Sequence, residues 1–202
     1  MQEYMKKTLE YYENNAKNYK NEWTDDFLKN YNFTVPSIFL EFLPKRASIL
    51  DLGCGTGRDS KYFLDHGYKV TAVDGSFEFC NMASKLLNIK VRELNFLDMD
   101  YHNEFDGVFA CASLLHLKDN DLLQVLKLIH TSLKDNGILY CSFKKGTGTR
   151  VDEKKRFYND MEEEKFKLLL NKLNVKFDLL KVWETNQYGS HQKFINFILR
   201  KE

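Results

Sequence analysis

Three glycines alternate with other residues directly after a short apolar run, in the segment Asp51-Leu52-Gly53-Cys54-Gly55-Thr56-Gly57. Glycine lets the backbone approach a ligand closely and adopts positive φ angles at which a side chain would clash. A dinucleotide fingerprint has the pattern GxGxxG, whereas here the third glycine comes one residue early and Arg58 stands in its place. The loop therefore predicts a nucleotide-type ligand and argues against NAD.

An acidic residue follows this loop at a distance that suits ribose binding. Asp74 stands seventeen residues after Gly57, at the end of an apolar segment that begins at Lys69. A carboxylate in this place can accept hydrogen bonds from both hydroxyls of a ribose. The glycine loop and the acid together predict an adenosine-type ligand.

These residues resemble the motifs of class I S-adenosylmethionine-dependent methyltransferases, which are Asp-x-Gly-x-Gly-x-Gly after the first strand and an acidic residue after the second. The resemblance extends from about Tyr11 to the end of the chain. Residues 11–19 (YYENNAKNY) and 105–117 (FDGVFACASLLHL) are similar to the small tellurite-resistance-like branch. The resemblance implies S-adenosylmethionine as cofactor and methyl transfer as activity, but this scaffold serves many acceptors.

The resemblance also assigns parts of the cofactor to residues at the strand ends. The glycine loop would line the methionine part and Asp74 would hold the ribose. Asn95 would meet the adenine amino group, and Phe96 would cover the adenine ring. Cys111 and Ala112 would lie under the sulfonium, and Arg58 or a tyrosine would meet the carboxylate. The residues expected to bind the cofactor are Tyr12, Tyr19, Asp51, Gly53, Cys54, Gly55, Arg58, Asp74, Gly75, Ser76, Asn95, Phe96 and Cys111.

The chemistry of methyl transfer needs little catalytic machinery. The reaction is an in-line displacement with a good leaving group, so the protein mainly aligns the acceptor and removes its proton where necessary. His116 follows the expected fourth strand and is the candidate general base, with a structural histidine as the alternative. The four cysteines and the other histidines are scattered, so we expect free thiols and no metal.

A basic segment follows the expected fifth strand and contains Lys144, Arg150 and Arg156. Guanidinium groups suit bidentate recognition of phosphate or carboxylate. We therefore expect an anionic small-molecule acceptor, phosphorylated, nucleotide-linked or sugar-type, with Tyr158 and His191 beside these cations. The alternative is a solvated loop that neutralises nearby acidic residues.

Strand and helix patterns alternate from residue 47 onward, which predicts an α/β fold with a mostly parallel sheet and helices on both faces. Tyr4–Asn30 carries aromatic residues, including Trp23 and Phe27, at the spacing of one or two amphipathic helices. The remaining helices are expected over Pro36–Leu43, Gly57–His66, Ser76–Leu87, Asp119–Gly137 and Asp160–Leu173, and the strands over Ala47–Leu52, Lys69–Val73, Lys90–Glu93, Phe105–Ala112, Ile138–Phe143, Val175–Trp183 and Lys193–Arg200. Residues 144–158 are expected to form a polar loop.

The expected architecture is a Rossmann-like sheet of seven strands in the order 3-2-1-4-5-7-6, with strand 7 antiparallel. Residues 1–202 would form one methyltransferase domain, in which residues 1–45 make a helical lid or cap. The chain is 43% hydrophobic and 29% charged, which suits one globular domain. A monomer is the default expectation, and a dimer remains open.

Charge and apolar patterning exclude several classes of protein. The formal net charge is +1, so nucleic acid is not an expected partner. The longest apolar run, 107–115, falls short of the roughly 20 residues that a membrane span needs. The polar N-terminal segment lacks the apolar core of a signal peptide, so we expect a cytoplasmic protein. The alternatives left open are a methyltransferase acting on RNA or protein, a non-catalytic S-adenosylmethionine-binding domain, and an NAD-dependent oxidoreductase.

Overall fold

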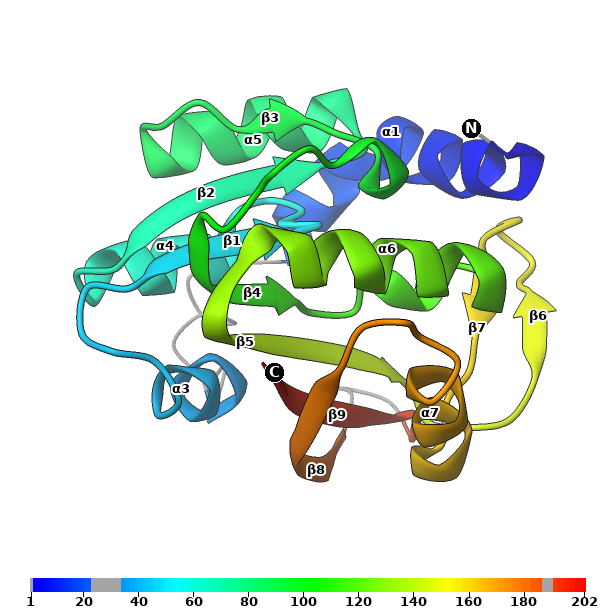
Figure 1. Ribbon diagram of the computed structural model, residues 1–202. Coiled ribbons are helices and arrows are strands. Elements are labelled where there is room, and N and C mark those ends of the chain that lie inside the picture. Colours follow the sequence, from blue (N-terminus) through cyan, green and yellow to red (C-terminus); the bar gives the residue numbers. More distant parts are fainter. Residues whose placement is uncertain (1, 23–33, 187–190) are drawn as a thin grey trace.

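The computed structural model in Figure 1 describes residues 2–22, 34–186 and 191–202. Trp23 and Phe27, which the sequence places in the N-terminal helical region, lie outside the described residues. Within the described ranges, no helix combines the length and the apolar character that crossing a membrane requires. The N-terminal helix α1 (Glu3–Glu22) lies near the ends of the strands that line the candidate site.

A seven-stranded sheet with the order β3-β2-β1-β4-β5-β9-β8 forms the centre of the molecule. Strands β3, β2, β1, β4 and β5 are mutually parallel, and β9 is antiparallel to both β5 and β8. This confirms the predicted α/β fold, strand order and antiparallel strand. The strands are β1 (Ser48–Leu52), β2 (Lys69–Asp74), β3 (Arg92–Glu93), β4 (Phe105–Ala110), β5 (Leu133–Lys144), β8 (Phe177–Asn186) and β9 (Lys193–Lys201).

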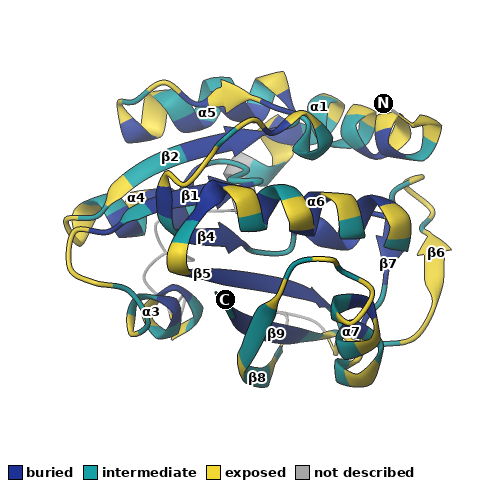
Figure 2. Ribbon diagram, in the orientation of Figure 1, coloured by how far each residue is buried: buried dark blue, intermediate teal, exposed yellow. Residues whose placement is uncertain are grey.

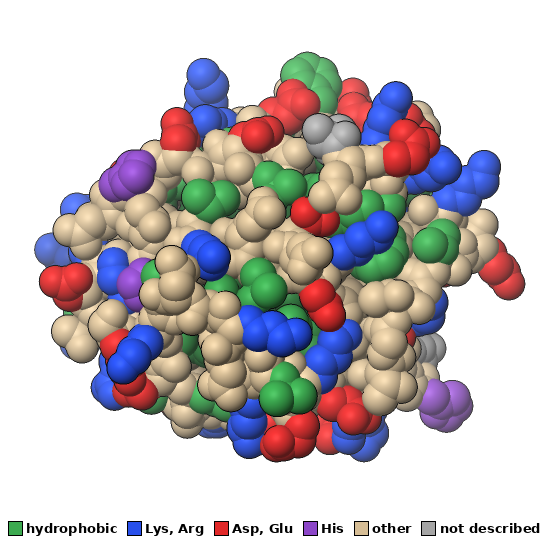
Figure 3. Space-filling view, turned by 45° about the vertical axis from the view of Figure 1, so that its right-hand side comes forward, with side chains coloured by type: hydrophobic (Ala, Val, Ile, Leu, Met, Phe, Trp, Pro, Cys, Tyr) green, Lys and Arg blue, Asp and Glu red, His purple; other side chains and the backbone are tan. Residues whose placement is uncertain are grey.

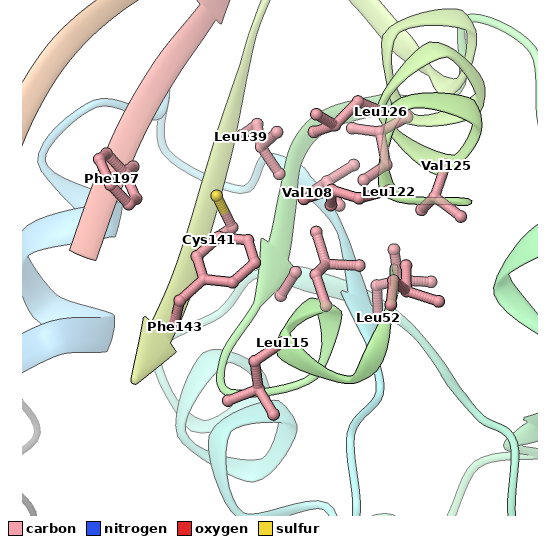
Figure 4. Close-up of a cluster of buried hydrophobic side chains, with 14 of the residues drawn as sticks. Leu52, Val108, Leu115, Leu122, Val125, Leu126, Leu139, Cys141, Phe143 and Phe197 are labelled. Atoms are coloured by element: carbon pink, nitrogen blue, oxygen red, sulfur yellow. The ribbon is translucent and has the colours of Figure 1, made fainter. Parts of the chain in front are cut away.

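Helices cover both faces of the sheet. Successive strand residues point to opposite faces, so Leu139 of β5 joins the core under helix α6, whereas Tyr140 joins a second core under α3 and α4. Figure 4 shows Leu52, Val108 and Leu139 facing Leu122 and Leu126 of α6. Figure 2 shows the central strands as almost uniformly buried. The helices are α3 (Thr34–Leu40), α4 (Arg58–Asp65), α5 (Phe77–Leu87), α6 (Asp119–Ser132) and α7 (Glu163–Leu170), with short 3-10 helices η1 (Phe96–Asp98) and η2 (Leu114–His116).

The largest differences from the sequence-based expectation concern the end of α6 and residues 144–158. Helix α6 ends at Ser132, not at Gly137, because Leu133 is already extended and pairs with Phe105 at the edge of β4. The expected polar loop 144–158 contains an antiparallel hairpin of β6 (Thr149–Val151) and β7 (Phe157–Asn159). All three β7 residues are buried, whereas β6 is exposed, so the exposed strand and the charged turn gave the segment its polar pattern.

Candidate functional site

A cavity of about 310 Å³ lies at the carboxyl ends of β1, β2 and β4, with α1 forming one wall. Ligands of open parallel sheets bind at this edge. The cavity brings together most of the residues expected to bind a cofactor: Tyr12, Tyr19, Gly53, Cys54, Gly55, Arg58, Asp74, Gly75, Asn95, Phe96 and Cys111. His116, the candidate base, lines the same cavity, whereas Asp51 and Ser76 lie behind its wall.

The glycine loop is held in a conformation that only glycine adopts easily. Gly53 and Gly57 have φ angles of 86° and 90°. The backbone N–H groups of Gly53 and Cys54 both donate to the Val73 carbonyl, at 2.9 and 3.0 Å, so the loop is fixed to the end of β2. A Cβ atom on Gly53 would lie 2.5 Å from the Cβ atom of Ser113. The loop therefore presents backbone atoms to the cavity and has no room for side chains at Gly53.

The carboxylate of Asp74 is oriented by backbone donors on either side. The Gly55 N–H donates to Oδ2 at 2.8 Å, and the Ser76 N–H donates to Oδ1 at 2.9 Å. Burial raises the pKa of Asp74 to about 6, although these backbone hydrogen bonds oppose the shift. At neutral pH the group is therefore an ionised acceptor that remains fixed at the cavity wall.

Asp51 and Ser76 support this wall from behind. The Ser60 hydroxyl donates to the Asp51 carboxylate at 2.6 Å, which joins β1 to α4. Burial, together with the nearby Asp59 carboxylate, raises the pKa of Asp51 to about 7. Ser76 is the N-cap of α5, and its hydroxyl donates to Glu13 of α1 at 2.6 Å. Both residues position the loop and helices rather than face the cavity.

Arg58 and Asn95 already have partners inside the protein. The Arg58 guanidinium donates to the neighbouring Asp59 carboxylate, with an Nε–Oδ1 distance of 2.9 Å. The Asn95 side-chain oxygen accepts from the Leu97 N–H at 3.1 Å and caps η1. Phe96 follows in η1 and approaches the glycine loop at Gly53. The end of the cavity near η1 is therefore lined by the Asn95 amide and the Phe96 ring.

His116 is held between α1 and β7 by both ring nitrogens. Its Nδ1 lies 2.6 Å from the Phe157 carbonyl oxygen, and its Nε2 lies 2.8 Å from the Tyr12 hydroxyl oxygen. A carbonyl only accepts, so Nδ1 carries the proton and Nε2 accepts from Tyr12. Burial lowers the pKa of His116 to about 4, so the imidazole is neutral at physiological pH.

The predicted basic residues gather around one aromatic ring next to the cavity. Lys144 Nζ lies 4.2 Å from the centroid of Tyr158, and the Arg150 and Arg156 guanidinium carbons lie at 4.5 and 5.3 Å. The Tyr158 and His116 rings are 4.8 Å apart, so this cation cluster (Lys144, Arg150, Arg156 and Tyr158) lies behind His116 and not in the cavity wall. His191 is exposed before β9 and belongs neither to the described cavity lining nor to this cluster.

Several cavity residues were not named as site residues by the sequence analysis. Met5, Thr8 and Leu9 of α1 line the cavity together with Tyr12, and Phe79 and Ser113 line it from other elements. The positions 5, 8, 9 and 12 follow helical spacing and mark one face of α1, which was the available signal. Within the described part of the chain, no group of three or more His, Cys, Asp or Glu side chains is arranged to hold a metal ion, and all four cysteines are free thiols.

A glycine loop after β1, a carboxylate after β2 and a cavity at this sheet edge define the architecture of class I S-adenosylmethionine-dependent methyltransferases. A family model described as a methyltransferase domain matches residues 49–137. The matched residues and the fold agree with this class, which the sequence motifs predicted. The narrower resemblance to the tellurite-resistance-like branch stays a prediction.

The curated relatives similar to this chain include two N-methyltransferases. Glycine/sarcosine N-methyltransferase of Parasynechococcus marenigrum is 30% identical over 141 residues, covering 60% of this chain and 50% of that protein. (S)-coclaurine N-methyltransferase of Papaver somniferum is 33% identical over 101 residues, covering 46% and 28%. The chain thus spans half or less of the length of these relatives.

One of the similar solved structures is 1,6-didemethyltoxoflavin-N1-methyltransferase of Burkholderia thailandensis, with bound 1,6-didemethyltoxoflavin and S-adenosylhomocysteine. It aligns with a TM-score of 0.81 at 23% identity and covers 98% of this chain and 89% of that chain. At this level of identity the likeness establishes the fold.

Proposed function

We propose that this protein transfers the methyl group of S-adenosylmethionine to a nitrogen or oxygen atom of a small anionic acceptor. The observation that carries the proposal is the Asp74 carboxylate, fixed by the Gly55 and Ser76 N–H groups beside a loop of backbone atoms. Such a carboxylate suits the two hydroxyls of a ribose. The bound cofactor would supply an electrophilic methyl group, and the chain would supply its position and a path for the acceptor proton.

The cation cluster supports an anionic acceptor. Arg150 pairs with Asp160, and Arg156 pairs with Asp152, at 2.8 and 2.7 Å. Among the described residues, no carboxylate forms an ion pair with Lys144. Burial, with the positive charges of Arg150 and Arg156, lowers the pKa of Lys144. The cluster therefore has one positive charge in excess, which a phosphate or carboxylate would neutralise.

A small acceptor is favoured over a nucleic acid. On the face that Figure 3 shows, Lys and Arg side chains alternate with Asp and Glu side chains instead of forming a continuous basic surface. Non-specific nucleic-acid binding depends on such a surface, because phosphate contacts supply most of its affinity. The two curated relatives named above are N-methyltransferases by name, which favours nitrogen as the acceptor atom.

Calorimetry with S-adenosylmethionine and S-adenosylhomocysteine tests the cofactor. The wild-type protein should bind both, and Asp74→Ala should bind them roughly 100-fold more weakly, because two hydrogen bonds to a charged group are lost. Asp135→Ala, which removes an exposed carboxylate on β5, is the control and should bind like the wild type. No binding by the wild-type protein would refute the proposal.

Turnover with a panel of acceptors tests the anionic acceptor. Formation of S-adenosylhomocysteine would be followed with glycine, sarcosine, phosphorylated amines and nucleotides. With the best anionic acceptor, Lys144→Gln should raise KM about tenfold, because the excess positive charge next to the cavity is lost, and should change kcat little. Lys127→Gln, an exposed lysine of α6, is the matched control. Preference for neutral acceptors, or an unchanged KM, would contradict this part of the proposal.

A further inference from the structure

We propose that the Tyr12 hydroxyl is the group that contacts the acceptor atom and passes its proton to His116. His116 then acts through Tyr12 rather than on the acceptor directly. This inference rests on the proposed methyl transfer and assigns the proton path for that reaction. This role differs from the one that the family resemblance implies for Tyr12, which is contact with the cofactor carboxylate.

The hydrogen bonds of His116 leave no ring nitrogen open to an acceptor. Nδ1 is committed to the Phe157 carbonyl, and Nε2 accepts from Tyr12. A proton from the acceptor therefore reaches Nε2 through the Tyr12 oxygen, unless this bond is first broken. The neutral state of the buried imidazole leaves the Nε2 lone pair available at physiological pH.

The Tyr12 ring is fixed so that its hydroxyl stays at this place. Its neighbours are Tyr19 and Phe79, with ring centroids 5.8 and 6.1 Å away, and the ring of His116 at 5.3 Å. Tyr12 and His116 line the same cavity as Cys111 and Ala112, the residues expected beneath the sulfonium. The Tyr12–His116 pair thus lies at the wall formed by α1 and faces the carboxyl end of β4.

A nearby guanidinium supports the transient charge on Tyr12. The Arg156 guanidinium carbon lies 5.7 Å from the centroid of the Tyr12 ring, and Arg156 Nη1 donates to the Tyr19 hydroxyl at 3.1 Å. A positive charge at this distance stabilises negative charge that develops on the phenol oxygen. The same charge disfavours a long-lived imidazolium, so His116 would pass its proton on to solvent.

Methyl transfer and proton transfer take place in one step. The acceptor lone pair forms a bond to the methyl carbon, the S–CH₃ bond breaks, and its electron pair remains on sulfur as the neutral thioether of S-adenosylhomocysteine. The acceptor N–H or O–H proton moves to the Tyr12 oxygen, while the Tyr12 proton moves to His116 Nε2. The imidazolium that forms then releases one proton to water. Tyr12 is neutral before and after the step.

Sinefungin tests this placement without an identified acceptor. In this cofactor analogue an amine-bearing carbon replaces the methylsulfonium, so its amine points to where the acceptor atom would be. The wild-type protein should bind sinefungin more tightly than S-adenosylhomocysteine. In Tyr12→Phe this preference should fall about tenfold, since one hydrogen bond to a charged group is lost. The affinity for S-adenosylhomocysteine should stay within about twofold of wild type, because the ring is retained.

A spectroscopic signal separates a relay from a merely structural tyrosine. With ¹⁵N-labelled histidine, sinefungin should shift the Nε2 resonance of His116 in the wild-type protein and leave it unshifted in Tyr12→Phe. Tyr11→Phe removes a hydroxyl from the adjacent residue of α1, outside the described cavity lining, and should behave like wild type in both measurements.

An unchanged sinefungin preference in Tyr12→Phe would overturn the inference while leaving the proposed function intact. A sinefungin-induced shift of His116 Nε2 that persists in Tyr12→Phe would also overturn it, because the imidazole would then sense the amine directly. Failure of the wild-type protein to bind S-adenosylhomocysteine would instead refute the proposed function, and this inference with it.

Discussion

The two halves of the cavity are built in different ways. The half around the glycine loop and Asp74 is lined by two short contiguous segments, 53–56 and 74–75. The half around Tyr12 and His116 is lined by side chains from α1 and η2, and Tyr12 and His116 are 104 positions apart in the sequence. A site formed by neighbouring residues of the chain can be predicted from a sequence motif. A site formed by side chains far apart in the sequence can be recognised only once the fold is known.

The largest expected effect is that of Gly53→Ala on the half around the glycine loop. The new Cβ would lie 2.5 Å from the Cβ of Ser113, at a φ of 86° that L side chains rarely adopt. Left-handed strain and overpacking together should lower the free energy of unfolding by about 3 kcal/mol. Chemical denaturation would measure this loss. Gly55→Ala is the control for strain alone, because nothing lies within 4 Å of its added Cβ, and an equal loss there would contradict the role of Ser113.

Cofactor affinity should depend on pH through Asp74. The pKa of this buried carboxyl is about 6 without cofactor, and the ionised form accepts the ribose hydroxyls. S-adenosylhomocysteine affinity should therefore be constant above about pH 7 and fall roughly tenfold for each pH unit below 6. Calorimetry between pH 5 and 8 would measure it. Asp74→Asn should bind weakly with a flat profile, and a retained pH dependence in that variant would point to Asp51 instead.

The sequence motifs place the residues around the glycine loop and Asp74, but only some of the residues around Tyr12 and His116. Asp74 and the three glycines follow buried strands within one βα unit each, so their spacing alone places them at one sheet edge. The hairpin was not predicted, because its buried residues Phe157 to Asn159 stand in a charged segment. The end of α6 was misplaced at Gly137, because the pairing of Leu133 with Phe105 is a tertiary contact that no helix signal contains.

A substitution at Thr8 should destabilise the half of the cavity around Tyr12 and His116 without changing the glycine loop. The Thr8 hydroxyl accepts from the buried Phe157 N–H at 3.1 Å and so fixes β7 to α1. Thr8→Val should lower the free energy of unfolding by about 1–2 kcal/mol, because a buried N–H loses its partner. Thr131→Val, on the exposed side of α6, is the matched control and should change stability little. If the free energy of cofactor binding falls by as much as the free energy of unfolding, the two halves of the cavity are not independent.

The smallest expected effect concerns Ala112, which lines the cavity with a φ of 50°. Ala112→Gly should stabilise the protein by about 0.5 kcal/mol, since relief of left-handed strain slightly exceeds the entropic cost of glycine. Thermal unfolding would measure this gain. Asn103→Gly, at an exposed position with a φ of 53°, should give no gain, because asparagine tolerates this conformation.

The hairpin stands apart from the seven-stranded sheet (Figure 1), and its strand β6 is exposed along its whole length (Figure 2). Strand β6 can therefore change in length or charge without altering the register of the main sheet or the glycine loop, whereas Arg156 and the Phe157 carbonyl hold Tyr19 and His116. Acceptor preference and cofactor binding can diverge independently in such an arrangement. Under the proposed function, β6 is accordingly the segment to exchange when a new acceptor is wanted.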